Sequence, residues 1–378
     1  MVEVVTPKSK IHDLTEAPRY VPIEVDGSSV YEVFATIWTV YNEKQKPSSF
    51  EFGAEWQQNV IDSTSEDLTD EIATLGGPYC SVWLSLLGLV ASAPRPHTPD
   101  NVFEWLSKIN PDRLRRWMLS YFGQWADLSL IERAAEGDID AVREIVGKEK
   151  PEEMVDHFVA LFEIDPEELR DRLTATLIEF HDKVFTKHAS EFPGAISRAA
   201  AARRAMASRD DVKTVIEEVT NGLEYEVPLG VKRVILVPSV VVRPLSLIDQ
   251  QRDTLLVMYA VADEFLDSDP EAPPSWLVRT YKALSDERRL RILRRIGEGE
   301  TTLDELTEML GLSKSTVHHH ISILRGAGLV RIHVPSEGKM HKTSTYGLRL
   351  QALDGAGQAL HAYLGNTETS SQKEMSLS

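Results

Sequence analysis

In the last quarter of the chain, two sequence signals for the beginning of a helix lie close to a glycine that ends a helix. Thr302 followed by Glu305 has the spacing of a capping box, and Gly311 ends the helix that this box begins. Ser313 then offers a second N-cap, for a helix that runs to about Arg325. Because a short turn containing glycine joins the two helices, the pattern predicts a helix-turn-helix pair.

The second of these helices has two unlike faces. At about 100° per residue, Val317, Ile321 and Leu324 form one apolar stripe that we expect to be buried. The opposite side carries short donors and imidazoles, and no acid occurs between Ser313 and Arg325. Such a face can approach base edges in a major groove. The candidate DNA-contacting residues are Lys314, Ser315, Thr316, His318, His319 and Ser322.

After this helix the pattern changes to a period of two, which predicts a hairpin over residues 330–349. Its first strand alternates apolar residues with Arg331 and His333. Its tip and descending arm are basic, with Lys339, His341 and Lys342. A hairpin that follows a helix-turn-helix is a wing, so we expect Arg331 and the three tip residues to contact phosphate or minor groove.

The segment from about 283 to 350 resembles the ArsR family of winged helix-turn-helix transcriptional regulators. The resemblance rests on ALSDERRLRIL and ELTEMLGLSKSTVHHHISILRGAGLVR. It implies a symmetric dimer that binds a pseudo-palindromic operator in double-stranded DNA and usually represses. It also places residues 314–316, 318 and 319 where the family approaches bases. His320 lies nearer the buried side, and we expect a structural role for it.

Metal sensing, common in that family, is not expected here. The helix 303–310, where many members carry thiolates, has no cysteine, and Cys80 is the only cysteine of the chain. The last helix offers only Asp354 and His361, too few ligands for a closed site. Consecutive helix residues diverge by about 100°, so the triple histidine cannot converge on one ion. We therefore predict no metal site and no cofactor.

The distribution of charge and a proline-rich segment together predict a domain boundary in the chain. The composition, 42% hydrophobic and 26% charged, is typical of a folded globular protein and excludes collagen-like and wholly disordered classes. Residues 277–364 hold 13 Lys and Arg against 9 Asp and Glu, a net charge of +4, whereas the remainder holds 28 against 50, a net charge of −22. A segment with three prolines and three acids separates the two parts. We predict an N-terminal sensor or dimerisation region at 18–265, a linker at 266–275, a winged helix at 276–365 and a disordered tail at 366–378.

The N-terminal region reads as mainly helical with a small antiparallel sheet, so the fold class of the whole chain is α+β. Helix starts are predicted at Ser65, Asp138 and Asp165. Three strands are expected near its end, from Leu223 to Val227, Lys232 to Val242 and Thr254 to Val261.

Two features of this region are candidates for binding a small-molecule effector. Trp105, Trp117 and Trp125 belong to an aromatic group that could line an apolar pocket, although core packing is the favoured interpretation. Arg243 lies inside the apolar run VKRVILVPSVVVRPLSLI, and a charge there needs a partner. We favour a salt bridge to an acid such as Asp249 or Asp253 over an acidic ligand.

The favoured function is a dimeric DNA-binding repressor whose N-terminal region dimerises or senses a non-metal ligand. The alternative is a protein-interaction module or an enzyme with an accessory winged helix. We expect no enzyme, because dinucleotide, P-loop and nucleophile-elbow motifs are absent from the sequence. The longest apolar stretch, Cys80 to Ala93, is shorter than the roughly 20 residues of a membrane span, and no signal peptide is recognisable, so no membrane contact and a cytoplasmic location are expected.

Overall fold

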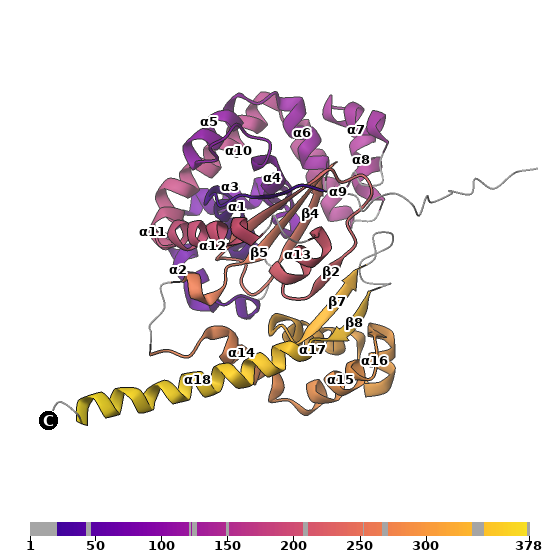
Figure 1. The fold of residues 1–378 in the computed structure, drawn as a ribbon. Coiled ribbons are helices and arrows are strands. Elements are labelled where there is room, and N and C mark those ends of the chain that lie inside the picture. Colours follow the sequence, from indigo (N-terminus) through magenta and orange to yellow (C-terminus); the bar gives the residue numbers. More distant parts are fainter. Residues whose placement is uncertain are drawn as a thin grey trace, which may run out of the picture.

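The computed structural model describes residues 21–42, 47–120, 122, 127–148, 151–206, 211–251, 253–266, 271–334 and 344–375. Figure 1 shows two parts, an N-terminal body built around a sheet and a C-terminal winged helix beneath it. One strand of the N-terminal region joins the sheet of the winged helix.

The sheet of the N-terminal body has four strands in the order β1-β3-β5-β4. β1 (Ile23–Val25), β3 (Arg233–Ser239) and β5 (Thr254–Ala260) are mutually parallel, and β4 (Leu247–Gln251) pairs antiparallel with β5. The α+β class is confirmed, but the predicted antiparallel sheet is wrong for three of these strands. β3 and β5 are buried almost throughout, and such continuous apolar runs are typical of parallel strands covered on both faces.

Alternate residues of β3 enter two different cores. Ile235 and Val237 pack with α1 (Val30–Tyr41) and α4 (Ser81–Val90) in the largest hydrophobic cluster. Val234 and Leu236 face the other side, where α13 (Val212–Val219) and part of α12 (Phe192–Met206) cover the sheet. The period of two thus places the sheet between helical layers.

The remaining helices of the body surround the first core (Figure 1). The side chains of Ser65, Asp138 and Asp165 cap three of them, as the sequence predicts. These helices are α2 (Gly53–Asp62), α3 (Glu66–Gly76), α5 (Pro99–Lys108), α6 (Pro111–Ser120), α7 (Leu128–Ala135), α8 (Ile139–Gly147), α9 (Glu152–Glu163), α10 (Pro166–Phe180) and α11 (Thr186–His188).

The C-terminal part has the element order of a winged helix around its own core. Its helices are α14 (Ser275–Leu284), α15 (Glu287–Gly297), α16 (Leu303–Leu310), α17 (Lys314–Gly326) and α18 (Leu350–Met375). Its strands are β6 (Thr301–Thr302), β7 (Val330–Val334) and β8 (Thr345–Leu348), paired in the order β7-β8-β6.

The wing sheet gains a fourth strand from the N-terminal region. β2 (Leu223–Tyr225) pairs in parallel with β7, so the sheet order is β2-β7-β8-β6. We predicted this strand for the sheet of the N-terminal body. It joins the wing instead because the edge of β7 offers unpaired backbone groups, which β2 satisfies.

α18 is longer than expected. We predicted a disordered tail from residue 366, but the helix continues to Met375 and extends beyond the rest of the winged helix (Figure 1). No proline follows Leu350, and Glu, Gln, Lys and Met near the end favour helix.

Candidate nucleic-acid interface

The helix-turn-helix is fixed by local hydrogen bonds. The Glu305 amide donates to the Thr302 hydroxyl at 3.3 Å, and the Thr302 amide donates to the Glu305 carboxylate at 2.8 Å. Both halves of the capping box are therefore present. Gly311 adopts the left-handed conformation, with φ 63° and ψ 31°, and the Ser313 hydroxyl accepts the Thr316 amide at 3.3 Å.

The two faces of α17 separate as predicted. Val317, Ile321 and Leu324 are at most 2% exposed and join the core of the winged helix. The outer face keeps its side chains in solvent: Lys314, Ser315, His318, His319 and Ser322 are exposed, and Thr316 is half-buried. This outer face of α17 is not packed against the protein's own body, so it is accessible to a duplex.

Lys314 and Ser322 of this outer face contact neighbouring groups of the protein. The Lys314 ammonium lies 2.5 Å from an Asp304 oxygen, with the two side chains 55% and 77% exposed. Pairs this exposed contribute little to stability, so a phosphate could replace the acid. Ser322 donates to the backbone carbonyl of His318 at 2.8 Å.

His320 belongs to the buried side. It is 7% exposed, and neither ring nitrogen has a hydrogen-bond partner among the described residues. Burial lowers its pKa, although Asp286 opposes this effect. The ring is therefore held neutral, which fits the structural role expected for it.

Arg331 is placed differently from the other predicted contacts. It lies on β7, and its guanidinium is 3.3 Å from Glu224 of β2. His333 of the same strand lies 3.4 Å from Glu224 and 3.7 Å from Glu226. The N-terminal region thus supplies two acids beside the wing. Lys339, His341 and Lys342 lie outside the described residues.

Arg243 forms a salt bridge, but with acids other than those predicted. Its side chain is 4% exposed, lies 2.6 Å from Glu51 and also pairs with Asp263. Asp253 was a wrong choice because β3 and β5 run in parallel, which places it beside Lys232, 3.3 Å away, at the opposite end of the strands.

Glu51 and Asp263 also reach the winged helix. The second oxygen of Glu51 pairs with Arg279 of α14. The second oxygen of Asp263 accepts the backbone amide of Trp276 at 2.9 Å. Sequence reasoning missed this network because Glu51 lies 192 residues from Arg243 and 228 residues from Arg279, and no local pattern connects such distant positions.

Trp105 and Trp117, two of the three tryptophans considered for an apolar pocket, lie in different surroundings. Trp105 and Trp117 are partly buried against the largest core, as the core-packing interpretation expects. Arg113 lies over the ring of Trp105, 5.6 Å from its centre. Trp117 also borders a polar cavity of about 460 Å³ together with Arg113, Arg116 and Arg233. Trp125 lies outside the described residues.

Across the described ranges, no group of three or more His, Cys, Asp or Glu side chains could hold a metal ion. Within the same ranges, no single helix has the length and apolarity of a membrane span, and only one pair, Glu66–Gly76 with Pro78–Val90, meets both criteria together, across a bend of 72°.

The comparisons with known proteins concern only the C-terminal part. Residues 286–331 match the family described as bacterial regulatory protein, arsR family. The HTH-type transcriptional regulator CmtR of Mycobacterium bovis is 43% identical over 60 residues, which are 16% of this chain and 51% of that protein. CmtR of Mycobacterium tuberculosis, in strains CDC 1551 and H37Rv, matches to the same extent. The chain therefore spans about half the length of the curated relatives it matches. No solved structure matches it.

Proposed function

We propose, from the premise that residues 286–331 form an ArsR-type helix-turn-helix, that this chain is a DNA-binding transcriptional regulator and acts as a dimeric repressor. The single observation that carries the proposal is the exposed outer face of α17, which contains no acid between Ser313 and Arg325. In this proposal, α17 enters the major groove, and Lys314, Ser315, Thr316, His318, His319 and Ser322 approach base edges.

The dimer is supported by an apolar groove between α14 and α18. The groove measures about 400 Å³ and is lined by Val278, Tyr281, Leu360 and Tyr363, among others. Tyr281 is 40% exposed, a large aromatic surface for a solvated helix. In a two-fold dimer through this groove, the two α17 helices have to lie about 34 Å apart to reach successive major grooves. Leu360→Glu is expected to convert the dimer to monomer in sedimentation equilibrium.

The support for a DNA contact is weaker for the wing than for α17. Arg331 is paired with Glu224, so a phosphate contact requires that this ion pair be exchanged. Lys339, His341 and Lys342 stay predicted contacts of the wing.

The test uses the full chain and DNA fragments from its own promoter region. Fluorescence anisotropy is expected to show a tight complex whose affinity falls steeply as salt rises, because phosphate contacts release counterions. A selection of bound genomic fragments is expected to return pseudo-palindromes. Absence of binding at low salt, with a chain that circular dichroism shows to be folded, would overturn the proposal.

A further inference from the structure

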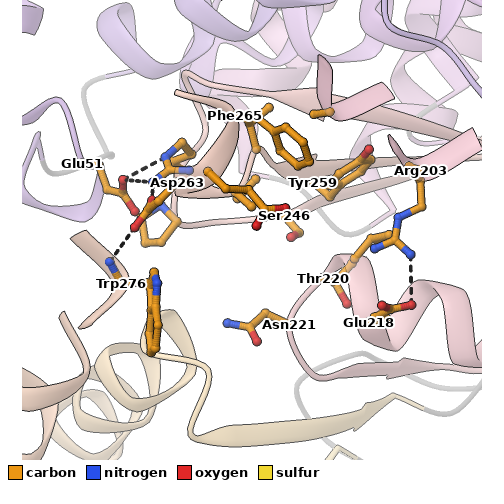
Figure 2. A pocket seen from close by; sticks show the side chains of 18 of the residues that line it. Glu51, Arg203, Glu218, Thr220, Asn221, Ser246, Tyr259, Asp263, Phe265 and Trp276 are labelled. Atoms are coloured by element: carbon orange, nitrogen blue, oxygen red, sulfur yellow. Dashed lines mark hydrogen bonds and ion pairs between the residues drawn. The ribbon is translucent and has the colours of Figure 1, made fainter. Parts of the chain in front are cut away.

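A cavity of about 430 Å³ lies where the N-terminal body meets the winged helix. Its sheet side is formed by the carboxyl end of β5, with Tyr259 and Ala260, and by Arg243 and Pro244 from the segment after β3. The carboxyl ends of strands are the edge where open α/β sheets commonly bind ligands (Figure 2). Trp276, Arg279 and Gly326 of the winged helix close the opposite side. The volume falls in the range of small-molecule sites.

The charges around this cavity are already matched. On one side Arg243 pairs with Glu51 and Asp263, and Glu51 also pairs with Arg279. On the other side, Arg203 and Glu218 lie 2.9 Å apart (Figure 2). Glu264, the remaining charged residue of the lining, is exposed to solvent. An ionic ligand would bring an unmatched charge into this setting, which is costly.

Aromatic and small apolar groups form much of the remaining wall. Phe265 and Tyr259 lie on the sheet side, and Trp276 lies across from them (Figure 2). Ala199 and Ala202 of α12 add a flat apolar surface. Such walls favour a ring that can stack or pack edge-on.

Tyr259 contributes one unsatisfied polar group. The residue is 6% exposed, and its hydroxyl makes no well-aligned hydrogen bond to a described residue. The Arg203 guanidinium lies close enough to lower the pKa of the phenol, against the larger effect of burial. Buried polar groups are normally paired, and Arg203 can only donate, so the phenol proton has no acceptor among the described residues and can be donated to a ligand. Burial raises the pKa of Tyr259 to about 12, so the phenol stays a neutral donor.

We propose that the cavity binds an uncharged, ring-containing small molecule that hydrogen-bonds to the Tyr259 hydroxyl, and that this molecule is the effector of the chain. The effector role rests on the proposed function, whereas the binding does not. Because Trp276 and Arg279 come from the winged helix and Tyr259 from the body, the ligand contacts both parts. Its affinity then depends on their arrangement, and by linkage so does the affinity for DNA.

The test of binding uses the full chain without DNA and three probes that share one ring. Benzamide is uncharged, whereas benzoate and benzylamine carry opposite charges. Ligand-detected NMR is expected to show saturable binding of benzamide in about the millimolar range, with the two charged probes at least about tenfold weaker. Equal or tighter binding of either charged probe, or no binding of benzamide, would overturn the proposal.

Two variants locate the site. Ala202→Phe fills the cavity and is expected to abolish benzamide binding, whereas Ala201→Phe, on the exposed side of the same helix, is expected to retain it. Tyr259→Phe removes only the unpaired hydroxyl, so it should weaken binding about five- to tenfold and leave the melting temperature of the unliganded chain unchanged. Equal loss in both alanine variants, or unchanged binding in Tyr259→Phe, would show that benzamide binds elsewhere.

The effector role is tested separately, on the complex with a promoter fragment. Saturating benzamide is expected to change the DNA affinity of the wild type at least about fivefold and to leave that of Ala202→Phe unchanged. Binding of benzamide without any change in DNA affinity would refute the effector role alone. Failure of the chain to bind any promoter fragment would refute the proposed function, and the cavity would still be judged by the experiments without DNA.

Discussion

Leu223 of the N-terminal region lies in parallel register with Ile332 of the wing. The Ile332 amide donates to the Gly222 carbonyl at 2.8 Å, and Leu223 is 6% exposed. Because backbone hydrogen bonds join the two parts here, the wing cannot move relative to α13 without breaking them. The strand pair therefore couples the position of the winged helix to the N-terminal body.

Glu224 on this shared strand is expected to restrain DNA binding. Its carboxylate neutralises Arg331, so Glu224→Ala frees a cation on the wing. We expect the DNA affinity to rise about threefold. The slope of log affinity against log salt concentration should become steeper by about one, because one more phosphate contact releases about one more counterion. Anisotropy titrations at several salt concentrations measure both.

The control for that variant is Glu144→Ala, which removes one exposed acid from α8. It corrects for the loss of negative charge far from the wing. Identical affinities for the two variants would mean that Arg331 does not reach the DNA.

Lys314 and Ser315 are expected to carry sequence discrimination. The double variant Lys314→Ala with Ser315→Ala should lose about 10- to 100-fold in affinity for the operator and keep weak binding to unrelated duplexes. Lys187→Ala, which removes an exposed cation from α11, should leave both affinities unchanged. An equal loss on every duplex would show that the two residues touch only phosphates.

His320 is expected to make stability depend on pH. Its folded pKa lies below the ordinary value of 6.5 because the ring is buried, so the unfolded chain takes up a proton first as the pH falls. This residue's contribution is complete above pH 6.5 and is lost as the pH falls from there through the folded pKa. Melting temperatures between pH 8 and 5 should fall more steeply in the wild type than in His320→Leu.

The exposed neighbour provides the comparison. His319 is a minor cause of the lowered pKa of His320, after burial, so His319→Leu should keep most of the wild-type slope. His97 has a raised pKa through its hydrogen bond to Asp26 and acts in the opposite direction, but equally in all three proteins. Parallel curves for wild type and His320→Leu would contradict the neutral, buried assignment.

Metal removal is expected to have no effect on DNA binding. No group of three or more His, Cys, Asp or Glu side chains that could hold a metal ion occurs among the described residues, and the helix before α17 has no cysteine. Operator affinity should therefore be the same before and after treatment with a chelator. A change that added zinc reverses would restore metal sensing as a function.

The C-terminal part could be predicted closely because its signals are local. The capping box at Thr302, the stop at Gly311 and the cap at Ser313 each depend on neighbours within four residues. The split of α17 into buried and exposed faces follows from helical periodicity. The antiparallel sheet of the N-terminal body was wrong because local patterns do not report which strand lies beside which.

The sequence by itself determined the helix-turn-helix, the acid-free face of α17 and the need of Arg243 for an acidic partner. Only the tertiary structure decided that this partner is Glu51, that β2 extends the wing and that a cavity lies between the two parts. The physical reason is range: caps and periodic faces arise from hydrogen bonds and rotations within a few residues, whereas these other features require segments far apart in the chain to meet.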